Sequence, residues 1–170
     1  LNELDVNGWL VEFQEAFGSS AEAESLVTFA NIAQAIGEFE RSMVFVDSSW
    51  RQYLDGDLGA LTDEAKQGAE LFFTSVDNGG AGCGACHNGS IFSDGQHHVV
   101  AFPHGGPGKG DINGDDFGRE RETGDESDRY QFRTPSLLNI ANTAPYGHAG
   151  VYESLEDVVR HYVNPDRAVR

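Results

Sequence analysis

The sequence predicts a mostly α fold with long glycine-rich loops. Apolar side chains recur at helical steps of three and four residues in several segments, and no segment alternates as a strand would. Glycine is unevenly placed, because 13 of the 21 glycines lie between residues 79 and 124. That stretch cannot form regular structure for long, and we expect it to wrap around something that fills the core.

The first two predicted helices come from apolar periodicity. Residues 8–17 form the first, and Gly18 is expected to end it, since glycine readily adopts the left-handed conformation at helix ends. The second helix covers roughly residues 22–46. The apolar positions are Trp9, Leu10, Phe13 and Phe17 in the first helix, and Leu26, Phe29, Ala33, Ile36, Phe39 and Met43 in the second.

The other two predicted helices are marked by N-cap residues. Thr62 precedes a helix that runs to about Phe72, with acidic residues in its first turn. Ser154 precedes a helix over 155–163, and Asp157 lies three residues after this cap. Together the four segments make the predicted fold mostly helical.

Charge and hydropathy limit the classes of partner that the protein can bind. The 170-residue chain is 39% hydrophobic and carries a formal net charge of −17, so a nucleic acid or an anionic membrane is excluded as a natural partner. A basic redox partner or a salty environment fits better. No apolar run is long enough to span a membrane. Residues 111–128 hold eight acids against two arginines and are expected to form a solvated loop.

One motif carries chemistry. The run from Cys83 through Gly84, Ala85 and Cys86 to His87 is the attachment signature of c-type haem, in which two thiols add to the haem vinyl groups. A zinc site would need about four ligands, and the chain has only these two cysteines. A thioredoxin-like dithiol expects a βαβ setting, and a disulfide needs no adjacent histidine. We therefore predict one covalent haem c with His87 as proximal iron ligand, in a periplasmic or extracellular protein.

The second axial position is open from the residues alone. The one methionine, Met43, lies far upstream and is expected to pack in a core. On the last helix Tyr162 shares the apolar face, whereas His161 points to the polar side with Arg160. Tyr162 is then either an ordinary buried aromatic residue or an iron ligand, and histidine or an open site remain alternatives.

The haem motif at 83–87 is one of eight segments with a shared family pattern. The others are 31–36, 39–42, 53–57, 92–94, 132–140, 143–150 and 155–159. Together these segments resemble the bacterial dihaem cytochrome c peroxidase and MauG family. The resemblance covers nearly the whole chain but only the C-terminal haem domain of a family member.

The resemblance implies that residues 1–60 are a helical segment linking from a missing N-terminal haem domain, and that 61–170 are the C-terminal c-type cytochrome domain. The sequence starts at Leu1 without an initiator methionine or signal peptide, so we expect it to begin within a longer protein.

The resemblance also implies ligands. A methionine follows the Pro-Tyr-x-His-x-Gly motif in the family's peroxidases, and MauG-like members carry tyrosine in that slot. Here the slot falls on Tyr162, 14 residues beyond His148. Thr143 and Pro145 match backbone-carbonyl ligands of a calcium ion whose remaining protein ligand comes from the missing half. A second calcium idea, an EF-hand-like loop from Asp111 to Glu122, lacks the glycine at position 6, and a solvated acidic loop is preferred.

Two further residues have alternative roles. Arg133 is either the partner of a haem propionate or a surface ion-pair residue. His148 belongs to the family motif. It either lines the haem pocket, or takes the distal position at the iron, or is a structural histidine. His97, His98 and His104 have no ligand spacing that supports a metal site.

The resemblance implies peroxide-linked oxidoreductase chemistry, with electrons passing between this haem and the N-terminal haem. The partners are then the missing N-terminal haem domain or a second chain, and a redox partner protein. The alternative is a monohaem electron-transfer cytochrome or a subunit of a multihaem assembly, which the single haem motif favours. A haem-based ligand sensor would need a displaceable sixth ligand.

Overall fold

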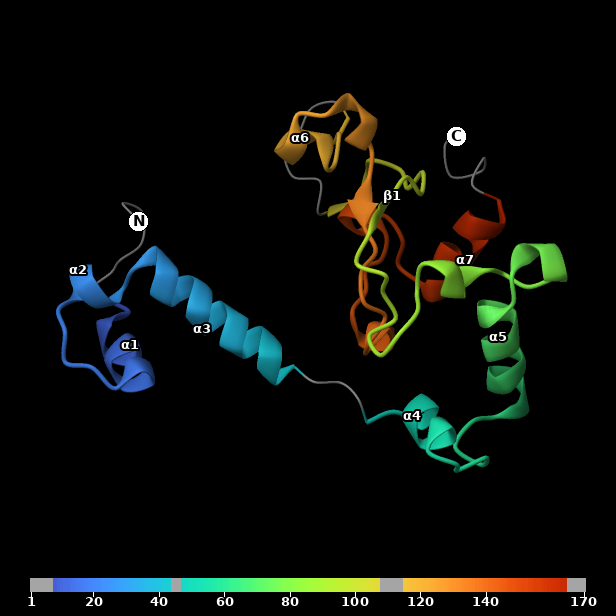
Figure 1. Ribbon diagram of the computed structural model, residues 1–170, viewed down its shortest axis with the longest axis horizontal. Coiled ribbons are helices and arrows are strands. Elements are labelled where there is room, and N and C mark those ends of the chain that lie inside the picture. The colour runs from blue at the N-terminus through green and yellow to red at the C-terminus, as the bar shows by residue number, and fades with distance from the viewer. Residues whose placement is uncertain (1–7, 44–46, 108–114, 165–170) are drawn as a thin grey trace. The chain divides into compact units, whose positions relative to one another are not determined.

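The computed structural model describes residues 8–43, 47–107 and 115–164 and is mostly helical (Figure 1). It divides into two compact units, Leu1–Phe45 and Val46–Arg170. These units are a different division from the two domains expected at 1–60 and 61–170, which stay a prediction. Within the described residues, no helix combines the length and apolar character needed to cross a membrane.

Among its described residues, the first unit contains three helices: α1 (Leu10–Phe17), α2 (Ala23–Leu26) and α3 (Phe29–Ser42). The prediction for the first helix is confirmed, and Gly18 ends it in the left-handed conformation with φ 59°. The small core of this unit lies at α2, where Ala23, Leu26 and Val27 are buried.

The single long helix predicted over 22–46 is wrong, because the chain breaks between α2 and α3. Val27 leaves the helical region with φ −85° and ψ 71°. The hydroxyl of Thr28 then accepts a hydrogen bond from the Asn31 amide at 3.2 Å, so Thr28 caps a new helix. Residues 44–46 lie outside the described part of the chain.

The apolar face of α3 is exposed within this unit. Phe29 is 77% exposed, and Met43, just past the helix, is 42% exposed. The expectation that Met43 packs in a core is therefore wrong for the unit in which it lies. The periodicity was detected correctly, but a helix face does not by itself reveal what covers it.

The second unit contains α4 (Ser49–Leu54), α5 (Asp63–Phe73), α6 (Glu120–Thr123) and α7 (Leu155–Val163). The two capped helices are confirmed. Thr62 accepts from the Ala65 amide and Ser154 from the Asp157 amide, each at 3.2 Å. The short helix α4, capped by Ser48, was not predicted, and α6 lies in the predicted acidic loop.

Apart from α6, the described residues between α5 and α7 are mostly irregular (green to red in Figure 1). Two strands lie among them, β1 (His97–His98) and β2 (Phe132–Arg133), which pair antiparallel with His97 opposite Arg133 and His98 opposite Phe132. Short 3₁₀ turns punctuate the rest of the second unit: η1 (Val76–Asn78), η2 (Cys83–Ala85), η4 (Glu126–Asp128), η5 (Ile140–Asn142) and η6 (His148–Gly150).

Candidate functional site

The two cysteines lie on one tight turn. Cys83 begins the 3₁₀ turn η2 and Cys86 follows its last residue, while the His87 amide donates to the Cys83 carbonyl at 2.9 Å. Residues three apart on a 3₁₀ turn lie one above the other, so this turn brings the two thiols to the same side. Both thiols are free and half-buried, and burial raises the pKa of each.

His87 is held in one orientation. Its Nδ1 lies 2.9 Å from the Phe92 carbonyl oxygen. A carbonyl only accepts hydrogen bonds, so Nδ1 must carry the proton and Nε2 keeps its lone pair. A histidine fixed through one ring nitrogen presents the other to a metal, which is the usual arrangement of an imidazole ligand.

The C-terminal part of helix α5 is hydrogen-bonded to the residues just before this turn. The Ala81 amide donates to the Leu71 carbonyl at 2.7 Å, and the Gly82 amide donates to the Thr74 carbonyl at 2.9 Å. Aromatic rings at the end of α5 pack against the same segment, with Phe72 and Phe92 6.3 Å apart between centroids. The motif is therefore anchored to a capped helix rather than held on a free loop.

Tyr162 lies on α7. Burial is the largest cause that raises the pKa of its phenol, and the electrostatic influence of Cys86 and Cys83 raises it further. The residue is 51% exposed, so it is not the buried aromatic residue that one alternative expected. Tyr162 therefore lies within electrostatic range of the two thiols and is open to a ligand.

The predicted orientation of His161 is wrong. His161 is only 2% exposed and its ring stacks on Phe102 with centroids 4.3 Å apart. One ring nitrogen lies 3.1 Å from the Tyr152 hydroxyl and the other 2.8 Å from the Val100 carbonyl oxygen. Because both nitrogens are hydrogen-bonded, an imidazole can replace an apolar side chain in the interior. Hydrophobic periodicity treats histidine as polar and missed this.

Arg133 and His148 lie in different surroundings. Arg133 is exposed, and within the described residues its guanidinium has no hydrogen bond or ion pair. His148 pairs with Asp116 through Nε2 at 3.1 Å and packs on Phe132 with ring centroids 3.9 Å apart. Arg133 is therefore available to an external anion, whereas one nitrogen of His148 is already engaged.

Thr143 and Pro145 lie between η5 and η6. The Thr143 hydroxyl donates to the Ile140 carbonyl at 3.2 Å. Among the residues described, no donor is bonded to the carbonyl oxygen of Thr143 or of Pro145. Asp111 and Asn113 of the EF-hand-like idea lie outside the described part of the chain.

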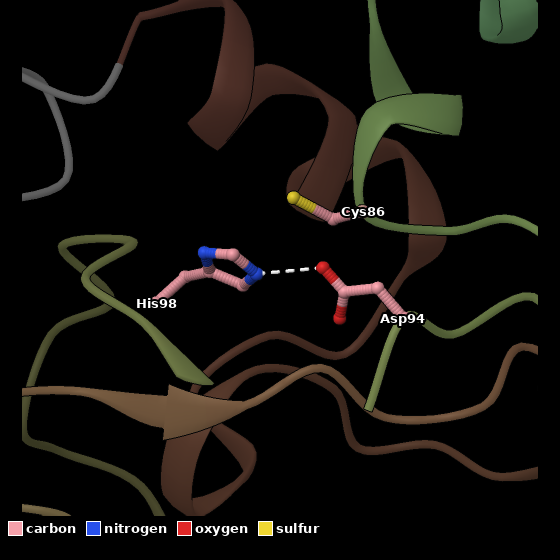
Figure 2. A group of neighbouring side chains, drawn as sticks. All are labelled: Cys86, Asp94 and His98. Carbon is pink, nitrogen blue, oxygen red and sulfur yellow. Dashed lines mark hydrogen bonds and ion pairs between the residues drawn. The ribbon is translucent and has the colours of Figure 1, made fainter. Parts of the chain in front are cut away.

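Sequence reasoning missed one cluster. Cys86 Sγ, an Asp94 carboxylate oxygen and a His98 ring nitrogen all lie within 4.8 Å of one another (Figure 2). His98 Nε2 is 2.8 Å from Asp94 Oδ2. In irregular chain, a spacing of four residues between Asp94 and His98 does not predict that the two side chains meet. The pairing of β1 with β2 helps to place His98, and the sequence does not reveal this pairing.

Within its described residues, the second unit buries no apolar side chain. Only Thr134 and His161 are buried there, at 6% and 2% exposed. Large apolar side chains from several elements keep half or more of their surface accessible. They are Leu54, Leu58, Leu71, Val76, Ile91, Val99, Val159, Tyr162 and Val163.

Comparison with known proteins agrees with these features. Residues 3–59 match the sequence profile of the family described as "Di-haem cytochrome c peroxidase". Cytochrome c551 peroxidase of Pseudomonas aeruginosa is 39% identical over 156 residues, which are 89% of this chain and 42% of that protein. The chain belongs to the dihaem cytochrome c peroxidase/MauG family.

Two other members show the breadth of this family. Methylamine utilization protein MauG of Methylorubrum extorquens is 32% identical, over 93% of this chain and 40% of that protein. The crystal structure of a MauG-like protein associated with microbial copper homeostasis superposes with a TM-score of 0.66 at 32% identity, covering 94% of this chain and 45% of that one. The chain thus spans about two fifths of the length of its curated relatives and belongs to a family of haem oxidoreductases.

Proposed function

We propose that this chain is the haem c redox domain of a dihaem cytochrome c peroxidase/MauG-like oxidoreductase, passing electrons between haems for peroxide-linked oxidation. In this proposal residues 61–170 are the C-terminal cytochrome domain. Residues 1–60 link it to an N-terminal haem domain, in the same protein or in a second chain. The observation that carries it is the turn from Cys83 to His87, which presents two free thiols and a histidine whose Nδ1 is held by the Phe92 carbonyl. This turn belongs to a unit in which no apolar side chain is buried among the described residues.

The haem-binding roles follow from the site. Cys83 and Cys86 would form the two thioether bonds, and His87 would bind iron through Nε2 while Nδ1 stays bonded to the Phe92 carbonyl. Tyr162 would be the distal ligand. When bound, the haem supplies one-electron redox chemistry at its iron.

Tyr162 would bind as a phenolate. Burial raises the pKa of the phenol, and Cys86 and Cys83 raise it further, so the phenol would give up its proton only to a strong Lewis acid. A phenolate favours ferric over ferrous iron because its charge neutralises the more positive state. The site would therefore work at low reduction potential, unlike that of a methionine-ligated carrier.

Two basic groups would complete the surroundings of the haem. The unpaired guanidinium of Arg133 would bind a propionate, the anionic group that haem brings. His148 would line the pocket while held by Asp116. Its bond to a carboxylate makes this lining role simpler than a distal-ligand role, which would need its remaining nitrogen.

Calcium is a further element of the proposal. The carbonyl oxygens of Thr143 and Pro145 accept no hydrogen bond within the described residues, and hard cations prefer such oxygens. Two carbonyls are too few ligands for calcium, so the site would be completed by the N-terminal haem domain. We further propose that the protein works in the periplasm or outside the cell, where covalent haem attachment normally takes place.

The second candidate is a monohaem electron-transfer cytochrome or a subunit of a multihaem assembly. The single Cys-x-x-Cys-His motif in this chain favours it. The two candidates differ in one feature of the longer protein. A second Cys-x-x-Cys-His motif upstream in the longer protein would support the first candidate. A longer protein without such a motif would support the second.

Electron exchange and peroxide turnover test the proposal directly. The haem-loaded chain is mixed with a reduced, basic c-type cytochrome, and its absorbance is followed before and after hydrogen peroxide is added. We expect electron exchange but no peroxide turnover by the chain alone, and turnover once an N-terminal haem domain is supplied. Turnover by the chain alone, or no electron exchange, would contradict the division of labour proposed here.

A further inference from the structure

Asp94 connects the haem motif to the strand pair. Its amide donates to the Cys86 carbonyl at 2.8 Å. Its carboxylate accepts from the Gln96 amide at 2.9 Å and contacts His98 Nε2 at 2.8 Å. The side chain is 17% exposed, so these bonds form largely out of water. The backbone of Asp94 is thus held by the motif, and its carboxylate is held by the Gln96 amide and by His98 of β1.

This carboxylate lies beside the atom that would carry the haem. Figure 2 shows the Cys86 sulfur, the Asp94 carboxylate and the His98 ring together, all within 4.8 Å. The three residue types resemble a metal-ligand set, but the attached sulfur would be a thioether and no longer a thiolate. In the haem-loaded protein the cluster is therefore a charge beside the haem edge rather than a metal site.

We propose that Asp94, oriented by His98, places a negative charge beside the haem attached at Cys86 and lowers its reduction potential, while His98 limits the size of this effect. This inference rests on the proposed function. A nearby carboxylate stabilises the ferric state, which carries one positive charge more than the ferrous state, and partial burial strengthens the effect.

The ionisation of Asp94 supports this assignment. Its hydrogen bond with His98 is the largest of the causes that lower the pKa of Asp94 to about 2. The carboxylate thus stays charged at neutral pH. His98 donates to it and moderates its field, so the two members of the pair act in opposite directions.

The opposed effects can be measured by potentiometric titration of the haem-loaded chain. Asp94→Asn removes the charge and should raise the midpoint potential. His98→Ala removes the donor, exposes the charge and should lower the potential. His98→Gln keeps a donor and should return the potential towards that of the wild type.

Two controls match these changes. Glu122→Gln removes one charge from the exposed surface of α6, and His97→Gln changes the neighbouring histidine, which contacts Arg119 instead. Neither should move the potential as the Asp94 and His98 variants do. If Asp94→Asn loses the haem, the comparison of His98→Ala with His98→Gln decides alone.

The outcomes separate the inference from the proposed function. Potentials of Asp94→Asn and His98→Ala that match those of the controls, with haem bound, would overturn the inference and leave the proposed function standing. A wild-type chain that carries no covalent haem would overturn the proposed function itself.

Discussion

Two histidines proposed for the site are each held by a hydrogen bond. The Phe92 carbonyl fixes the tautomer of His87, and Asp116 engages one nitrogen of His148. Tyr162 differs, because it is half-exposed and its phenol is influenced by the two thiols. That difference makes Tyr162 the residue whose role is easiest to test.

Replacing Tyr162 with phenylalanine should change the low-temperature electron paramagnetic resonance spectrum of the ferric protein. Loss of the phenolate changes the axial ligand field of the iron, so the signal positions should shift. Tyr146→Phe is the matched control, since the Tyr146 hydroxyl bonds to the Ile140 carbonyl at 2.9 Å. Identical spectra for Tyr162→Phe and wild type would return Tyr162 to a packing role.

Replacing Arg133 with glutamine should lower the midpoint potential of the haem. The guanidinium would neutralise a propionate, and its loss leaves negative charge that disfavours the ferrous state. Arg121→Gln removes the same charge from a residue that pairs with Asp116 at 3.5 Å. Equal potentials in the two variants would show that Arg133 is an ordinary surface residue.

Asp94 should make the folded state sensitive to acid. Its pKa falls from the ordinary 3.8 to about 2 on folding, so the charged form stabilises the fold. That contribution is complete above about pH 4 and is lost as the pH falls towards about 2. Asp94→Asn should therefore reduce the pH dependence of the unfolding free energy in this range, measured by urea denaturation. An unchanged slope would contradict the assignment.

The residue scale also shows how far sequence reasoning reaches. The attachment motif was readable because its chemistry requires adjacent residues. The orientation of His161 was not, because it depends on Tyr152 and on the Val100 carbonyl, which is 61 positions away. The Asp94–His98 pair was not predicted for the same reason, because the pairing of β1 with β2 helps to place His98.

At the scale of elements, local capping controls what can be predicted. The helices that follow Thr62 and Ser154 were predicted from their caps and are confirmed. The break at Thr28 uses the same chemistry, yet the apolar pattern continues through it and concealed it. Short elements such as α4 and the two-residue strands carry too few residues for periodicity to detect.

Alanine substitutions at two glycines test the packing of η2 on α5. A Cβ at Gly84 would lie 2.8 Å from a ring atom of Phe73, whereas a Cβ at Gly68 would meet nothing within 4 Å. Gly84→Ala should destabilise the fold by about 1–3 kcal/mol through overpacking. Gly68→Ala lies within α5 and should stabilise it by about 0.5–1 kcal/mol. Thermal unfolding of both variants checks the signs, and a stabilising Gly84→Ala would contradict this packing.

At the scale of the whole molecule, the described residues of the second unit bury no apolar side chain. They leave large apolar side chains accessible, and Tyr162 lies within electrostatic range of the thiols of the motif. The sequence indicated this through its glycine-rich region and attachment motif. It could not indicate how the first unit divides from the second, because apolar periodicity says which face is buried but not against what.

The central claim is that a covalent haem completes this unit, and haem content tests it most directly. The chain is produced with a haem-attachment system, and the haem per chain is measured from intact mass and from the pyridine haemochrome spectrum. One covalent haem per chain is predicted, with none in the Cys83→Ala, Cys86→Ala double variant and a lower thermal midpoint for that variant. A wild-type chain that folds without haem and melts at the same temperature as the double variant would contradict the account.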